Sequence, residues 1–134
     1  MYIADISETA IAEVRYHQES YWRNVTGLHY DRVVFKELIC TFDVDEGLDA
    51  TGLPANDPIY DRVDYSQSRL LGREIKSMPE VSVLKYTSVR KAGGICHALF
   101  TPRGIADIIP AKHYEMIWDR GAIGSVNEVS GTGT

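Results

Sequence analysis

The stretch Ser7–Thr26, SETAIAEVRYHQESYWRNVT, repeats its apolar residues with the period of an α-helix. Asp5 or Ser7 can cap the start of this helix, and Gly27 ends the pattern. At about 100° per residue, one stripe on its surface collects Ala10, Val14, His17, Tyr21 and Val25, and Ile11 and Trp22 widen it. The sequence therefore predicts a helix with this stripe in the core.

Glu13 lies at the border of that stripe, about 40° around the helix from His17 and about 60° from Ala10. A carboxylate at such a border can line a cleft. The alternative is a solvated glutamate paired with His17 one turn later, which stabilises a helix by a few tenths of a kcal/mol. Helix geometry alone favours the solvated pair.

Outside this helix, strands and a second helix alternate irregularly, which predicts one α+β domain over residues 1–122. A strand ends at Ala4, and a second one spans 31–43, with Val34, Leu38, Cys40 and Phe42 on one face. The remaining expected elements, in chain order, are a loop (45–58), a helix (65–78), a hairpin of two strands (81–89 and 95–100) around the turn 90–94, a strand (114–118) and a disordered tail (123–134).

The composition is that of an ordinary globular protein, with 134 residues of which 44% are hydrophobic and 25% charged. A net charge of −5 without clustered Lys and Arg argues against direct binding of nucleic acid. No apolar run is long enough for a membrane span, and the first ten residues do not form a secretory signal, so we expect a cytoplasmic protein with no membrane partner. Cys40 and Cys96 are then expected to be reduced.

Motifs of the common catalytic and metal sites are absent from the chain. The histidines and cysteines show no HExxH, CxxC or HxH spacing, so no metal site is expected. GxSxG, GxxxxGK[ST] and GxGxxG are absent as well.

One further segment has residues suited to an anion. Tyr86-Thr87-Ser88-Val89-Arg90 ends a predicted strand beside a Gly-rich turn, where backbone N–H groups, Arg90 and Lys91 are candidates to bind phosphate. The alternative is an edge strand whose polar residues face water, which composition favours.

An ordered series of short segments resembles the RES-domain family. They are Tyr2-Ile3-Ala4, TAIAEVRYH (9–17), Ile59-Tyr60-Asp61, Asp64-Tyr65-Ser66-Gln67, YTSVR (86–90) and CHALF (96–100). No single segment is specific, but their order extends over nearly all of residues 1–120.

The resemblance implies a fold similar to ADP-ribosyltransferases and the toxin half of a bacterial toxin–antitoxin pair with an Xre-type antitoxin as partner. It further implies an enzyme that consumes NAD as its substrate, with no separate cofactor, as an NAD phosphorylase, a glycohydrolase or an ADP-ribosyltransferase. The Glu of the family falls on Glu13 as the catalytic residue, the Ser on Ser88 and an active-site Tyr on Tyr2, both as substrate-binding residues.

The family's Arg lies upstream of the strand that holds Tyr2, so we expect the chain to be a RES domain that lacks its N-terminal stretch. Arg15 lies some 160° around the helix from Glu13 and is a poor substitute. Two alternatives therefore remain beside an active toxin: a catalytically impaired RES remnant that only binds an Xre-type antitoxin, and an unrelated α+β protein.

Overall fold

The computed structural model describes residues 1–43 and 47–129. Within these residues the elements form two compact units, one of residues 1–12, 43 and 47–104 and the other of residues 13–42 and 105–129. One unit holds a four-stranded mixed sheet and the other a three-stranded antiparallel sheet. This arrangement of helices and strands confirms the expected α+β class.

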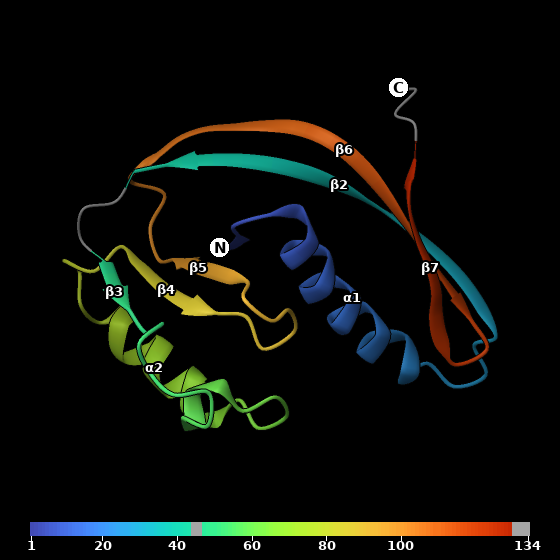
Figure 1. Cartoon of the computed structure of the whole chain (residues 1–134), viewed down its shortest axis with the longest axis horizontal. Helices are drawn as coiled ribbons and strands as arrows, with labels where there is room; N and C mark the ends of the chain where they lie inside the picture. Colours follow the sequence, from blue (N-terminus) through green and yellow to red (C-terminus); the bar gives the residue numbers. More distant parts are fainter. Residues whose placement is uncertain (44–46, 130–134) are drawn as a thin grey trace. The chain divides into compact units, whose positions relative to one another are not determined.

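Helix α1 (Ser7–Arg23) forms where the sequence predicts it and ends three residues before the predicted limit (Figure 1). Gly27, with φ +78°, turns the chain shortly afterwards. The predicted apolar stripe is only partly right: Trp22 at its margin is buried, but His17 is exposed and Tyr21 is 67% exposed. Outside the stripe, Thr9 is fully buried and Glu13 is half-buried. Tertiary packing thus decides which side chains of the helix are covered, beyond what its hydrophobic pattern predicts.

The sheet of the first unit has the order β1-β5-β4-β3. Its strands are β1 (Tyr2–Ala4), β3 (Gly47–Asp49), β4 (Val83–Thr87) and β5 (Ile95–Leu99). β4 and β5 form the predicted antiparallel hairpin, and β1 pairs antiparallel with β5. Val83, Cys96, Ala98 and Leu99 are buried and form the central part of this sheet's core.

The predicted loop 45–58 contains a strand that the sequence did not reveal. β3 pairs parallel with β4, and residues 44–46 lie outside the described residues. Three residues carry too little periodicity to predict a strand, and β3 exists because β4 supplies its hydrogen-bond partners. The chain then forms a short 3-10 helix η1 (Pro58–Tyr60), whose Tyr60 is buried.

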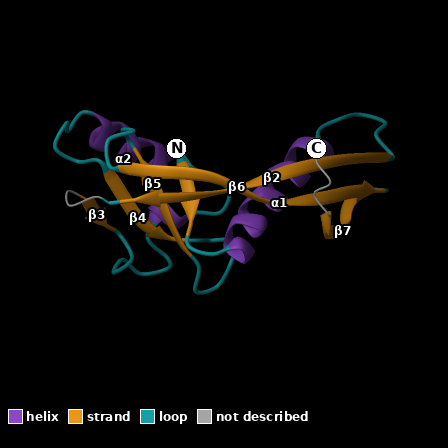
Figure 2. Cartoon of the chain, turned by 90° about the horizontal axis from the view of Figure 1, so that it is seen from above, coloured by secondary structure: helices purple, strands orange, loops and turns teal. Residues whose placement is uncertain are grey.

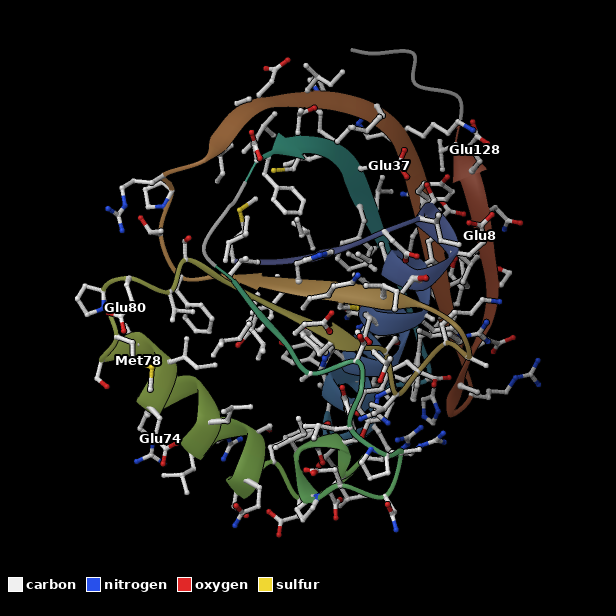
Figure 3. The ribbon with its side chains drawn as sticks, turned by 60° about the vertical axis from the view of Figure 1, so that its left-hand side comes forward. Glu8, Glu37, Glu74, Met78, Glu80 and Glu128 are labelled. Atoms are coloured by element: carbon white, nitrogen blue, oxygen red, sulfur yellow. The ribbon has the colours of Figure 1, made fainter. Side chains whose placement is uncertain are left out.

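Helix α2 (Ser66–Lys76) confirms the helix predicted at 65–78. Figures 1 and 2 both draw it beside β3 and β4. Ile75 is 1% exposed and faces the interior, whereas Leu70 is 45% exposed. Figure 3 shows Glu74 on the outward side of this helix. The helix is therefore amphipathic, with its apolar side covered.

The second unit contains a sheet of order β2-β6-β7 and the rest of α1. Its strands are β2 (Tyr30–Phe42), β6 (Ile105–Asp119) and β7 (Ala122–Val129). Its core side chains are the buried Trp22, Met116, Trp118 and Ile123. The two indole rings lie 5.8 Å apart between centroids.

Two predictions about this sheet need correction. The strand predicted at 114–118 begins nine residues earlier, at Ile105, because β2 pairs with it over its whole length. The tail predicted to be disordered from residue 123 is wrong as far as Val129, because β7 pairs antiparallel with β6. Gly124 and Ser125 lower the intrinsic strand preference, but the neighbouring strand supplies the missing stability. Residues 130–134 lie outside the described residues.

The predicted face of β2 is only partly right. Cys40 and Phe42 are half-buried, but Val34 and Leu38 are exposed, at 42% and 56%. A bulge interrupts the pairing with β6 between Lys36 and Leu38, and the extra residue lies on β6.

Candidate functional site

Ser88 stands directly after β4, at the start of a closed turn. Its Oγ accepts hydrogen bonds from the backbone N–H groups of Arg90 and Lys91, both at 3.1 Å. Its own N–H donates to the carbonyl of Gly94 at 2.9 Å, and the N–H of Gly94 donates to the carbonyl of Lys91. A serine that bonds its own turn in this way has a defined side-chain orientation. The predicted site residue Ser88 is therefore fixed in place.

The turn fits closely against the first turns of α1. A Cβ on Gly94 would lie 2.7 Å from both Cγ2 and Oγ1 of Thr9, which is fully buried. Gly94 is therefore needed for space, while Gly93, with φ +78°, supplies the left-handed backbone of the turn. The Gly-rich character of the segment thus has two separate physical causes.

Tyr2 lies on the edge strand β1 of the same unit, and its side chain is 80% exposed. It pairs with Ala98, which pairs in turn with Leu84, so the three share one face of the sheet. Ser88 lies two strands across and four residues along from Tyr2. At ordinary strand spacings this is a backbone separation of roughly 15 Å. The two residues thus belong to one sheet but are not in contact.

Glu13 lies in the middle of α1, at the first position of the second unit, and is half-buried. Tyr16 is half-buried as well, whereas His17 is exposed. The exposure of His17 separates it from the predicted stripe.

The two basic residues of the turn differ in their surroundings. Nη2 of Arg90 donates to the backbone carbonyl of Arg62 at 2.7 Å and to the hydroxyl of Tyr65 at 2.9 Å. Lys91 is exposed. Both therefore stay candidates for phosphate binding, but the Arg90 side chain already has protein partners.

A row of polar residues on the sheet was missed by the sequence reasoning. Asp49, Lys85 and His97 lie directly opposite one another on β3, β4 and β5. Partial burial lowers the pKa of His97, and the positive charge of Lys85 lowers it further, against the opposing effect of Asp5 and Asp49. The pKa of Asp49 is held below its usual value by hydrogen bonds from the hydroxyl and N–H of Thr51. The predicted hairpin could have indicated that Lys85 lies opposite His97. The position of β3, which adds Asp49 to the row, could not be predicted from the sequence.

Two absences apply to the described residues only. Within residues 1–43 and 47–129, no group of three or more His, Cys, Asp or Glu side chains is arranged to hold a metal ion. None of the helices in this part of the chain is both long and apolar enough to cross a bilayer. Cys40 and Cys96 are not joined to each other by a disulfide bond.

Comparison with known families identifies the chain at the level of its domain. The model of the RES domain matches residues 1–119, which include Tyr2, Glu13 and Ser88. The chain belongs to the RES domain family. No curated protein matches it. The RES domain thus extends over β1 to β6, and the family membership predicted from the ordered segments is confirmed.

Proposed function

We propose that this RES domain binds NAD and cleaves the bond between nicotinamide and ribose. The observation that carries the proposal is the family match over residues 1–119, a range that includes Tyr2, Glu13 and Ser88, the residues expected from the family resemblance. The fixed hydroxyl of Ser88 and the half-buried carboxylate of Glu13 support it. A hydroxyl held in place is suited to orienting a polar substrate.

In the proposed reaction, the C–N bond breaks with both of its electrons going to the ring, so that neutral nicotinamide leaves. The ribose carbon then has oxocarbenium character, and the carboxylate of Glu13 stabilises its positive charge. An acceptor oxygen forms the new bond to this carbon, and its proton passes to solvent when the acceptor is water. Glu13 is the catalytic residue of this scheme.

Tyr2 and Ser88 act as substrate-binding residues. Ser88 fixes a polar group of the substrate by a hydrogen bond, and Tyr2 presents an exposed ring for stacking together with a hydroxyl. Their backbones are roughly 15 Å apart at ordinary strand spacings. A dinucleotide is long enough to contact both. Lys91, exposed on the Ser88 turn, is the residue we propose for the pyrophosphate.

The direct test is release of nicotinamide from NAD by the purified chain. Glu13→Gln is expected to abolish the release with little change in melting temperature, because the amide keeps the shape but not the charge. Glu8→Gln is the matched control, since Glu8 is an exposed carboxylate on the first turn of the same helix (Figure 3). Absence of turnover in the unmodified chain, or equal activity in both variants, contradicts the proposal.

The acceptor is identified in the same assay. Hydrolysis gives ADP-ribose in phosphate-free buffer, phosphorolysis requires added phosphate, and protein modification attaches a labelled ADP-ribosyl group to protein. These products differ in mass and charge.

We further propose that the chain is the toxin of a bacterial toxin–antitoxin pair and that an Xre-type antitoxin is its partner. Family membership supports this assignment. Co-expression with an Xre-type antitoxin is expected to yield a stable complex with suppressed NAD turnover. Separate elution of the two proteins, with undiminished turnover, contradicts the pairing.

A further inference from the structure

Arg90 connects two segments of the first unit that are far apart in sequence. Its backbone N–H donates to Oγ of Ser88, and its side chain donates to Arg62 and Tyr65, which precede α2. A terminal guanidinium nitrogen carries two N–H groups. Both groups of Nη2 are therefore used by these two acceptors.

The segment that receives Arg90 is itself well fixed. The carboxylate of Asp61 accepts hydrogen bonds from the N–H groups of Val63 and Asp64, and the pKa of Asp61 is lowered by these two bonds. The ring of Tyr65 lies 5.8 Å from the guanidinium carbon of Arg69. The acceptors of Arg90 are thus held by local contacts, so the guanidinium is fixed at its far end.

Tyr60 provides a second connection between the same two regions. Its hydroxyl donates to the carbonyl of Ala50 at 2.6 Å and accepts from the N–H of Thr87 at 3.4 Å. Thr87 directly precedes Ser88. The end of β4 and the turn after it are therefore attached to the preceding segment on both sides of Ser88.

We infer that Arg90 is a positioning residue that holds the Ser88 turn through Arg62 and Tyr65, and that it does not itself contact the substrate phosphates. The expected effect of Arg90 on the kinetics with NAD rests on the proposed function, whereas its role in holding the Ser88 turn does not. A phosphate contact through Nη2 would have to replace two charge-assisted hydrogen bonds, which makes that nitrogen a poor donor to a ligand.

The kinetic test compares Arg90→Ala, Arg90→Lys, Tyr65→Phe and the Arg90→Ala/Tyr65→Phe double variant. For a positioning residue, Arg90→Ala raises KM for NAD about tenfold, as loss of a charge-assisted hydrogen bond predicts, with a smaller change in kcat. Tyr65→Phe also raises KM for NAD, and the double variant has a KM no higher than that of Arg90→Ala. Arg90→Lys does not restore KM, because lysine lacks the planar guanidinium group. Tyr21→Phe, at an exposed tyrosine, is the control.

Amide hydrogen exchange tests the inference without NAD. The N–H groups of Arg90 and Lys91 donate to Ser88, so faster exchange of both amides is expected in Arg90→Ala and in Tyr65→Phe, and not in Tyr21→Phe. Unchanged exchange in these variants overturns the inference, as does a KM that rises in Arg90→Ala but not in Tyr65→Phe and recovers in Arg90→Lys. If the unmodified chain releases no nicotinamide, the proposed function fails and the exchange measurement alone decides the role of Arg90.

Discussion

The indole N–H of Trp22 donates a hydrogen bond to the carboxylate of Asp31 across 3.1 Å. Trp22 is 3% exposed and closes the core of the second unit together with Trp118. Asp31 is the second residue of β2 and also accepts a hydrogen bond from the N–H of Arg32. The pair therefore joins the last turn of α1 to the first residues of the sheet.

Replacement of Asp31 tests how much this pair contributes. Asp31→Ala leaves the part-buried indole N–H without its acceptor and is expected to lower the free energy of unfolding by about 1–3 kcal/mol. Asp31→Asn keeps an acceptor oxygen and should cost less. Urea denaturation of both variants measures the difference, and Asp107→Ala, at an exposed aspartate of β6, is the control. Equal stability of the alanine and asparagine variants would show that the indole does not depend on this acceptor.

A methyl group at Gly94 is expected to destabilise the first unit. Gly94→Ala places a carbon 2.7 Å from the side chain of Thr9, and overpacking of this kind costs about 1–3 kcal/mol. Thr9→Ala removes the opposing atoms, so the double variant should be more stable than Gly94→Ala alone. Thermal unfolding of the three variants measures this coupling.

Gly72→Ala is the matched control for that substitution. Gly72 lies inside α2, and a Cβ there meets nothing within 4 Å. Alanine in a helix interior is favoured over glycine by up to about 1 kcal/mol, so a rise in melting temperature is expected. Similar destabilisation by both alanines would rule out a specific contact between Gly94 and Thr9.

The elements that sequence reasoning located are those whose signal is local. α1 and α2 have helical periodicity and end near polar or glycine residues, and the β4–β5 hairpin has β-branched strands around Gly93-Gly94. β3 and β7 were missed because their stability comes from a neighbouring strand distant in sequence. The covered residues of α1 were only partly predicted for a similar reason, since tertiary contacts bury Thr9 outside the stripe and leave Tyr21 exposed within it.

The candidate site shows the same difference between residues with a local sequence signal and residues that depend on distant contacts. Ser88 and Glu13 could be selected from the ordered family segments, and the glycines beside Ser88 indicated a turn. The partners of Arg90 are 25 and 28 residues away in sequence, and no periodicity connects them. The row of Asp49, Lys85 and His97 likewise depends on pairing between three strands, one of which has only three residues.

Ser88→Ala is expected to weaken NAD binding and to loosen its turn at the same time. The methyl group cannot accept from the N–H groups of Arg90 and Lys91. Ser88→Thr keeps the acceptor oxygen and should preserve the turn. A rise in KM for NAD in the alanine variant, with faster exchange of these two amides, is the expected result. Unchanged KM in Ser88→Ala would remove Ser88 from the proposed binding residues.

His97 is expected to make folding stability depend on pH between about 5 and 7. Its pKa in the folded chain is lowered by burial and by Lys85, while in the unfolded chain it is near the ordinary value of about 6.5. Below that value the unfolded chain binds more protons than the folded chain, so stability falls as the pH falls through this window. The carboxylates with lowered pKa, Asp5, Asp49, Asp61 and Asp64, start from 3.8 and lose their contribution only at lower pH.

Melting temperature measured from pH 7 to pH 5 separates this effect from other titrations. His97→Gln should flatten the decline, because the side chain no longer takes up a proton on unfolding. Lys85→Met should flatten it partly, since it removes the positive charge opposite His97 but leaves the burial. His29→Gln, at an exposed histidine, is the control that should keep the original slope. If His97→Gln and His29→Gln decline in parallel with the unmodified chain, proton uptake by His97 does not govern stability in this range.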